Sequence, residues 1–105
     1  MAELRFDDRV AVITGAGRGL GAAYARFLAS RGAKVVVNDP GVSMTGDGND
    51  VGAAQQVVQE IKAAGGEAVA NIDSVATPAG GEAIIKTALD HYGRIDILIH
   101  NAGNV

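Results

Sequence analysis

The chain has 105 residues, of which 48% are hydrophobic and 20% charged, and its net charge is −3. This length corresponds to one domain at most, and the apolar fraction excludes a disordered chain. The mild acidity excludes a strongly basic nucleic-acid-binding protein, so we expect no nucleic-acid partner. No cysteine is present, which excludes a disulfide framework, a thiolate metal site and a cysteine nucleophile.

The N-terminal segment MAELRFDDRV carries mixed charges and lacks the apolar core of a secretory signal. No apolar run approaches the ~18 residues that a membrane span needs. We therefore expect no membrane partner. The expected location is the cytoplasm, or the peroxisome if the source is eukaryotic.

The first half of the chain alternates between strand and helix patterns. A short apolar run predicts a buried strand over 10–14, and helical spacing then predicts a helix over 19–31. A second buried strand is predicted over 34–38, before a loop over 39–49 rich in Gly, Pro, Ser, Asn and Asp. The apolar residues expected to face the core from the helix are Leu20, Ala23, Phe27 and Leu28.

The second half repeats this alternation. Asp50 can cap a second helix that ends at Gly65-Gly66, and a third strand follows over 67–71. Thr77-Pro78 has the residue types of an N-cap and a first helical position, so a third helix begins there and closes at Gly93. The apolar residues expected to face the core from these helices are Ala54, Val57, Val58 and Ile61, then Ile84, Ile85, Ala88 and Tyr92.

A fourth strand, predicted over 95–99, completes the order βαβαβαβ. Short strands without clean alternation are buried on both faces, which is typical of a parallel sheet covered by helices. Right-handed crossovers are expected to place those helices on alternating sides of the sheet. The predicted fold class is therefore α/β, a Rossmann-like doubly wound parallel sheet.

The junction after the first strand is rich in glycine and precedes a helix. Unsatisfied N–H groups at a helix start favour an anion, and glycine lets a phosphate approach the backbone closely. Two registers compete here, Gly17-x-Gly19-x-x-Ala22 and Gly15-x-x-x-Gly19-x-Gly21. The second is favoured because the strand ends at Thr14, so that the turn begins at Gly15. The alternative is a tight turn that binds no ligand.

Asp39 follows the second strand, 24 residues after Gly15. A carboxylate there can accept hydrogen bonds from the hydroxyls of an adenosine ribose, and it repels a 2′-phosphate. Asp39 therefore predicts NAD as the cofactor, although Arg18 near the phosphates could also meet a 2′-phosphate. The alternative is that Asp39 only starts a turn before Pro40.

Two motifs, Thr14-Gly-x-x-x-Gly-x-Gly21 and Asn101-Ala102-Gly103, resemble those of the short-chain dehydrogenase/reductase family in order and separation. The resemblance covers the chain from about Arg9 onward. It implies a truncated sheet of order 3-2-1-4, so that residues 1–105 form a single, incomplete dinucleotide-binding domain. Within the family, the hydroxyacyl-CoA dehydrogenase part of peroxisomal multifunctional enzyme type 2 is similar at Arg5–Asp7, Val35–Asp39, Gly41–Gly48, Ala70–Val75 and Gly93–Asp96.

The resemblance also implies roles in binding NAD. Asp39 would hold the ribose, and Asp73 and Ser74 would meet the adenine edge. Asn101-Ala102-Gly103 would contact the cofactor and brace the sheet. The residues implied at the diphosphate are Gly15, Arg18, Gly19, Leu20 and Gly21.

The family's chemistry uses a Tyr four residues before a Lys, together with a Ser and a further Asn. At that spacing Tyr24 is followed by Leu28, and Tyr92 by Asp96. We therefore expect no catalytic residue in this chain and no activity of the chain alone. His100 stands where the family often has Asn, and we interpret it as a packed, hydrogen-bonded residue at the strand end.

Three interpretations remain open at this point. The first is the N-terminal part of an NAD-dependent oxidoreductase that interconverts a secondary alcohol and a ketone, with a 3-hydroxyacyl-CoA as the substrate class that the resemblance favours. The second is a free-standing NAD-binding module without catalysis. The third is a structural remnant that binds no ligand. The fourth strand would have an unpaired outer edge, which we expect to pair with another chain, to be covered by further sequence or to aggregate. A homo-oligomer is the predicted assembly.

Overall fold

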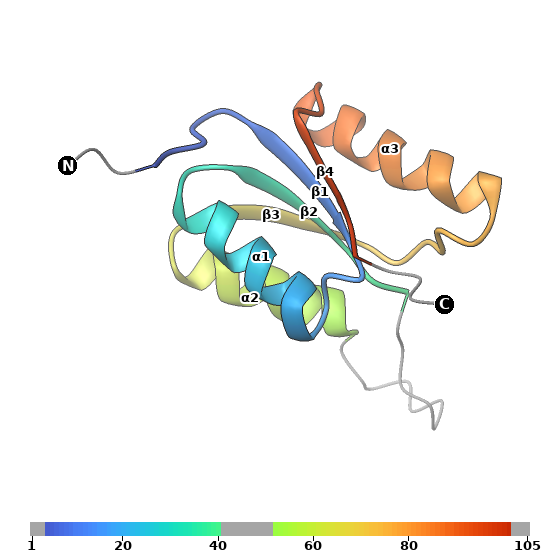
Figure 1. Cartoon of the computed structure of the whole chain (residues 1–105), viewed down its shortest axis with the longest axis horizontal. Coiled ribbons are helices and arrows are strands. Elements are labelled where there is room, and N and C mark those ends of the chain that lie inside the picture. Colours follow the sequence, from blue (N-terminus) through green and yellow to red (C-terminus); the bar gives the residue numbers. More distant parts are fainter. Residues whose placement is uncertain (1–3, 41–51, 102–105) are drawn as a thin grey trace.

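The computed structural model describes residues 4–40 and 52–101, where four parallel strands form one sheet in the order β3-β2-β1-β4 (Figure 1). The strands are β1 (Val10–Thr14), β2 (Lys34–Asn38), β3 (Glu67–Asn71) and β4 (Ile97–His100). The helices are α1 (Gly19–Ser30), α2 (Ala53–Ala63) and α3 (Pro78–Tyr92). The predicted fold class and the strand order 3-2-1-4 are confirmed, and β4 begins two residues later than expected.

Helices cover both faces of the sheet, but they do not alternate as predicted: α1 and α2 pack on one face and α3 on the other (Figure 1). The crossovers from β1 to β2 and from β2 to β3 run in the same direction, so their right-handedness places both helices on one face. Successive side chains of a strand point to opposite faces, so β1 contributes to two apolar clusters. Ala11 and Ile13 pack in the cluster beneath α1 and α2. Val10 and Val12 pack in a smaller cluster with Ile84 of α3. All five residues of β1 are buried, which agrees with the continuous apolar run in its sequence.

The face that α1 turns to the sheet differs from the predicted one. Leu28 is buried as expected, but Leu20 is 61% exposed and Phe27 is 44% exposed, and Ala23 is exposed as well. Small side chains allow α1 to lie close to the sheet, and this close approach selects a different stripe of the helix. The buried residues of α1 are Gly21, Ala22, Ala25, Leu28 and Ala29.

The helix ends follow the sequence signals in α3. The Thr77 hydroxyl accepts a hydrogen bond from the N–H of Gly80, Pro78 occupies the first turn, and the helix closes at Gly93. In α2 the N-cap position is Gly52, and no side chain caps the helix there. Asp50, the expected cap, lies outside the described residues.

Two further residues of α3 were expected in the core. Ile85 is 36% exposed, so this part of the prediction is wrong. Tyr92 is half-buried, and its ring lies 5.8 Å from the Lys34 ammonium. Burial, followed by the nearby charge of Glu67, raises the pKa of Tyr92 to about 12.

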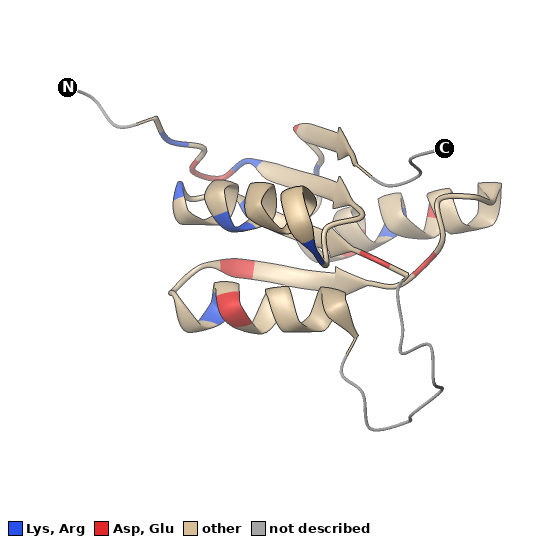
Figure 2. Ribbon diagram, turned by 60° about the horizontal axis from the view of Figure 1, so that its bottom comes forward, with Lys and Arg blue, Asp and Glu red and all other residues tan. Residues whose placement is uncertain are grey.

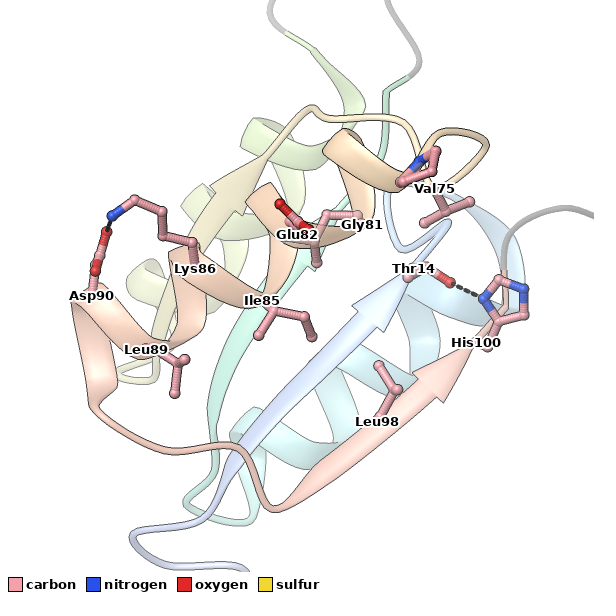
Figure 3. Close-up of a pocket in the computed structure, with 12 residues that line it drawn as sticks. Thr14, Val75, Gly81, Glu82, Ile85, Lys86, Leu89, Asp90, Leu98 and His100 are labelled. Carbon is pink, nitrogen blue, oxygen red and sulfur yellow. Dashed lines mark hydrogen bonds and ion pairs between the residues drawn. The ribbon is translucent and has the colours of Figure 1, made fainter.

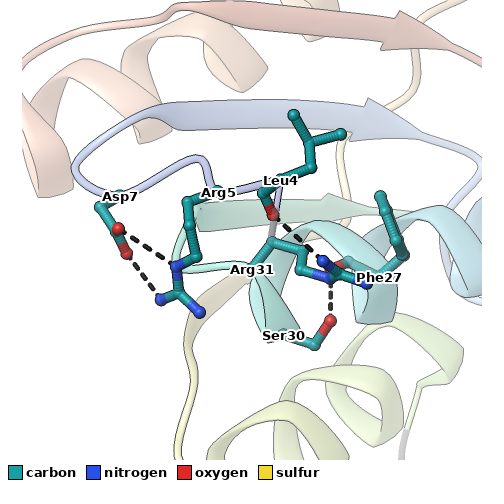
Figure 4. A network of polar contacts seen from close by, with 6 residues as sticks. All are labelled: Leu4, Arg5, Asp7, Phe27, Ser30 and Arg31. Carbon is teal, nitrogen blue, oxygen red and sulfur yellow. Dashed lines mark hydrogen bonds and ion pairs between the residues drawn. The ribbon is translucent and has the colours of Figure 1, made fainter. Parts of the chain in front are cut away.

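The segment before β1 is tied to the end of α1 (Figure 4). The Arg31 guanidinium donates to the carbonyl of Leu4 (3.2 Å), and the Arg31 carbonyl accepts the N–H of Phe6 (2.7 Å). The same guanidinium lies 5.1 Å from the centre of the Phe27 ring. This cation–π contact accounts for an aromatic residue on the outer side of α1.

Asp96 links the amino ends of β1 and β4. Its carboxylate accepts hydrogen bonds from the Arg94 guanidinium (2.7 Å) and from the N–H of Val10 (2.9 Å), and Arg9 lies 3.6 Å away. The Arg94 hydrogen bond, and after it the Val10 N–H, lower the pKa of Asp96 from its ordinary value of 3.8. The ionised carboxylate therefore stabilises the folded chain above this ordinary pKa.

Below the lowered folded-state pKa, Asp96 carries a proton in both the folded and the unfolded chain. We therefore expect the stabilisation by Asp96 to be lost as the pH falls through this pKa. Asp96→Asn should lower the urea midpoint at neutral pH and change it little once the pH lies below the lowered folded-state pKa. Asparagine keeps an oxygen that can accept from Val10, so the comparison isolates the charge. An equal loss at both pH values would contradict this assignment.

Candidate functional site

The carboxyl ends of the four strands meet at one edge of the sheet. The crossovers from β1 to β2 and from β3 to β4 run in opposite directions, so the chain reverses its order between β1 and β4. In open parallel sheets, ligands bind outside the carboxyl ends at such a switch point. Figure 2 shows acidic positions in the connecting segments that follow strand ends. The sequence-predicted site residues that the structure describes all follow strands at this edge.

The glycine turn occupies the space between the end of β1 at Thr14 and the start of α1 at Gly19. Gly15 has a φ of 63° and Gly19 a φ of 56°, which is the left-handed region that favours glycine. The turn therefore begins at Gly15, in agreement with the favoured register. Apart from Gly19, its chain neighbours and the nearby backbone of α1, no heavy atom of the described residues lies within 4 Å of the place where a Cβ of Gly19 would stand. One side of the turn is open.

The start of α1 is suited to an anion. Arg18 is the N-cap residue, and neither it nor another described side chain caps the helix; the first turn also contains no acidic residue. The first N–H groups of a helix have no intrahelical acceptor, and the helix dipole makes this end positive. Leu20, in the same turn, is 61% exposed and leaves the backbone accessible. These donors fit a diphosphate group.

Gly21 lies where α1 approaches the turn and β4 most closely. A Cβ at this position would overlap the Gly15 carbonyl oxygen and would lie 2.6 Å from Nδ2 of Asn101. Asn101 donates this Nδ2 to the Gly15 carbonyl (3.1 Å) and its own N–H to Oγ1 of Thr14 (3.0 Å). The end of β4 is thereby braced against the glycine turn. Ala102 and Gly103 lie outside the described residues.

Asp39 lies beside the same turn. Its Oδ2 accepts the N–H of Gly17 (3.0 Å), and its own N–H donates to the carbonyl of Asn71 (3.0 Å). A Cβ on Gly17 would lie 2.7 Å from this carboxylate oxygen and 2.6 Å from Cβ of Ala53, so a glycine is required. The structure therefore adds Gly17 to the candidate site. The competing register Gly17-x-Gly19 was the signal for it.

Asp73 and Ser74 follow β3 and are half-buried. Oδ2 of Asp73 accepts a hydrogen bond from Nδ2 of Asn71 (2.9 Å), and Oγ of Ser74 accepts the N–H of Ala76 (3.0 Å). The carbonyl of Asp73 also accepts a hydrogen bond from Nδ2 of Asn38 (2.8 Å), which holds the segment between β3 and α3 next to the end of β2. The segment lies at the edge of the sheet opposite β4. The site residues thus form a row from β3 to β4 with the glycine turn between.

His100 is hydrogen-bonded as expected, because its Nδ1 lies 3.2 Å from Oγ1 of Thr14. It is exposed, however, so the interpretation as a packed residue is wrong. Within the described residues β4 is an edge strand, and no neighbour covers its outer side. Thr14 was not expected in the site, although it joins His100 to Asn101. Its position as the last strand residue before the turn was the signal for this role.

A groove of about 740 Å³ lies between α3 and β4 (Figure 3). Its floor and walls are largely apolar and include Ile85, Leu89 and Leu98. Leu98 is 59% exposed and Leu89 is 49% exposed. Thr14 and His100 form the polar end of the groove, next to the glycine turn. The groove therefore adjoins the candidate site, but its lining consists mainly of exposed apolar side chains of α3 and β4.

Residues 4–40 and 52–101 offer neither a metal centre nor a membrane span. This part of the chain contains no group of three His, Cys, Asp or Glu residues that could hold a metal ion. None of its helices has the length and apolar character needed to cross a membrane.

A family model described as short chain dehydrogenase matches residues 9–105. The chain is 64% identical over 104 residues to a peroxisomal hydratase-dehydrogenase-epimerase of Neurospora crassa, covering 98% of this chain and 11% of that protein. It is 56% identical over 100 residues to the peroxisomal multifunctional enzyme type 2 of Mus musculus, covering 95% of this chain and 13% of that protein. The chain thus spans a small part of these relatives.

The chain is also similar to solved structures of dehydrogenases. A short chain dehydrogenase from Mycobacterium avium has a TM-score of 0.84 and 49% identity, covering 94% of this chain and 36% of that chain. A 7α-hydroxysteroid dehydrogenase complexed with NADH and 7-oxo glycochenodeoxycholic acid has a TM-score of 0.81 and 38% identity, covering 95% of this chain and 36% of that chain.

Proposed function

Because the chain belongs to the short-chain dehydrogenase family, we propose that it forms the NAD-binding, N-terminal part of an oxidoreductase that interconverts a secondary alcohol and a ketone. In this proposal residues 1–105 are a single, incomplete dinucleotide-binding domain. The observation that carries it is the contact between Asp39 and Gly17, in which a carboxylate stands 3.0 Å from the N–H of an open glycine turn. A dinucleotide needs backbone N–H donors for its diphosphate and, beside them, a carboxylate acceptor for the adjoining ribose.

The residues have distinct roles in this proposal. The open N–H groups at Gly19, Leu20 and Gly21, together with Gly15 and Arg18, hold the diphosphate. Asp39 accepts the ribose hydroxyls, and Asp73 and Ser74 meet the adenine edge. Asn101-Ala102-Gly103 contacts the cofactor where β4 ends. When bound, NAD accepts or donates the hydride.

The preference for NAD over NADP rests on charge. A 2′-phosphate on the ribose would meet the Asp39 carboxylate, and two negative groups at hydrogen-bond distance repel each other strongly. Arg18 lies at the start of α1, on the diphosphate side of the turn. One of the solved neighbours, the 7α-hydroxysteroid dehydrogenase, is a complex with NADH, which supports a nicotinamide cofactor for this chain.

The substrate and location are proposed from the relatives. Several of the relatives are named peroxisomal hydratase-dehydrogenase-epimerase or peroxisomal multifunctional enzyme. These names favour the peroxisomal alternative over the cytoplasm for this chain. The 3-hydroxyacyl-CoA class is proposed from the sequence resemblance to the hydroxyacyl-CoA dehydrogenase part of such enzymes.

We expect the 105-residue chain to bind NAD without catalysing turnover, because its sequence contains no Tyr-x-x-x-Lys. Titration calorimetry with NAD measures binding, and absorbance of the reduced nicotinamide measures turnover with a 3-hydroxyacyl-CoA. Absence of heat up to millimolar NAD would overturn the binding proposal. Turnover by the chain alone would show that other residues supply the acid and base.

We also propose that this 105-residue chain forms a homo-oligomer. The support is the unpaired edge of β4 and the exposed apolar side chains beside it, Ile85, Leu89 and Leu98. Light scattering should find the 105-residue chain larger than a monomer, and Leu98→Lys should reduce this association. A monodisperse monomer with fast deuterium exchange along β4 would argue against self-association.

A further inference from the structure

A buried polar cluster joins the ends of β2 and β3 to α3. Asn38, the last residue of β2, is fully buried, and Asn71, the last residue of β3, is 7% exposed. Nδ2 of Asn38 donates to Oδ1 of Asn71 (2.9 Å) and to the carbonyl of Asp73 (2.8 Å). Asn38 therefore holds both the side chain of Asn71 and the backbone of Asp73, the second residue after β3.

Asn71 holds Asp73 at two points. Its Oδ1 accepts the N–H of Asp73 (2.8 Å), and its Nδ2 donates to Oδ2 of Asp73 (2.9 Å). The same Nδ2 donates to Oγ1 of Thr87 (2.8 Å), whose hydroxyl donates to the carbonyl of Ala83 (2.9 Å). The direction of each bond around Asn71 is therefore set by its neighbours. The second carboxylate oxygen of Asp73 has no hydrogen bond among the described residues.

The cluster carries a free-energy cost that a purely structural contact would not require. Oδ1 of Asn38 is buried and has no hydrogen-bond partner in the described part of the chain. A buried acceptor without a partner loses its hydrogen bonds to water and forms none in the protein. An apolar side chain would avoid this loss. The hydrogen bonds that the cluster does make, in contrast, favour one conformation of the segments they join. The conformation specified here is that of Asp73.

We propose that Asn38, Asn71 and Thr87 are positioning residues for adenine recognition. They hold Asp73 so that its remaining carboxylate oxygen accepts a hydrogen bond from the 6-amino group of the adenine. An ionised carboxylate is an acceptor only, so it favours the 6-amino group of adenine over the 6-oxo group of hypoxanthine. This inference rests on the proposed function, in which Asp73 meets the adenine edge.

The test compares two dinucleotides. Dissociation constants for NAD and for nicotinamide hypoxanthine dinucleotide are measured by calorimetry on the 105-residue chain, and their ratio reports the reading of the 6-amino group. We expect the wild-type chain to prefer NAD by about tenfold, as for a hydrogen bond to a charged group. Thr87→Val removes one anchor of Asn71 and should lower this preference to about threefold or less. Thr87→Ser keeps the hydroxyl and should restore it.

Ile84→Val is the matched control, because Ile84 lies on the same helix and is 3% exposed but belongs to the apolar cluster. It should weaken both dinucleotides equally if it weakens either, and leave their ratio unchanged. A second measurement needs no ligand. The Asp73 amide should exchange with deuterium faster in Thr87→Val than in the wild type or in Ile84→Val, because its acceptor on Asn71 is less firmly held.

The outcomes separate this inference from the proposed function. A wild-type chain that binds neither dinucleotide overturns both. A wild-type chain that binds NAD without preference, or a Thr87→Val variant that keeps the full preference, overturns the inference and leaves the NAD site standing. Unchanged exchange of the Asp73 amide in Thr87→Val also overturns it.

Discussion

Asp39→Ala should weaken NAD binding about 10- to 100-fold, since hydrogen bonds to a charged group contribute about 1.5–3 kcal/mol. The carboxylate is placed for this role by the N–H of Gly17 on one side and by the Asn71 carbonyl, which holds its backbone, on the other. Titration calorimetry with NAD and NADP measures the effect. The variant should lose affinity for NAD and should discriminate less against NADP, because the repulsion of the 2′-phosphate disappears.

Two comparisons make this result specific. Asp39→Asn keeps an oxygen that can accept from Gly17 and lacks the charge, so it should reduce the discrimination against NADP while retaining more NAD affinity than alanine. Asp90→Ala removes an exposed carboxylate on α3 that pairs with Lys86 at 2.9 Å, and it should change neither affinity. Unchanged NAD affinity in Asp39→Ala would refute the ribose assignment.

Gly21→Ala should lower the free energy of unfolding by about 3 kcal/mol, at the upper end of what overpacking usually costs. The added Cβ would overlap the Gly15 carbonyl oxygen and lie 2.6 Å from Nδ2 of Asn101. Both neighbours belong to the hydrogen bond that braces β4 against the glycine turn, so neither can move without breaking it. Urea unfolding followed by circular dichroism measures the loss.

Gly81→Ala is the matched control for Gly21→Ala. Gly81 lies inside α3, and beyond its chain neighbours and the nearby backbone of its own helix, no heavy atom of the described residues stands within 4 Å of an added Cβ. Alanine favours a helix interior by about 1 kcal/mol over glycine, so this variant should be slightly more stable than the wild type. A Gly21→Ala variant with the wild-type urea midpoint would mean that α1 does not approach the turn as closely as the structure shows.

The order of the elements and the position of the glycine turn could be predicted because their signals are local. The run over 10–14 has the composition of a buried strand, and Thr77-Pro78 and Gly93 mark the two ends of one helix. These signals depend on neighbouring residues within a few positions. The face of α1 could not be predicted in the same way. Leu20 and Phe27 match helical spacing, yet the sheet accepts the small residues of another stripe.

The candidate site shows the same division. The residue types at Gly15, Gly19 and Asp39 indicate a dinucleotide by their positions after two strands. Gly17 meets Asp39 across 22 positions of the sequence, and Thr14 meets Asn101 across 87. No periodic pattern records such pairs, because they arise only when the parallel strands align their carboxyl ends.

By itself the sequence determined the resemblance to the family, through two motifs, as well as the alternation of strands and helices and the chemistry available at the strand ends. The alternation and this chemistry follow from composition and spacing within single elements. Only the tertiary structure decided which small residues of α1 face the sheet, that Gly17 stands against Asp39, and that Asn38, Asn71 and Thr87 together hold Asp73. The physical reason is that close packing and hydrogen bonding between distant segments depend on the register of the sheet. This register pairs Asn38 with Asn71, and no single strand or helix specifies it alone.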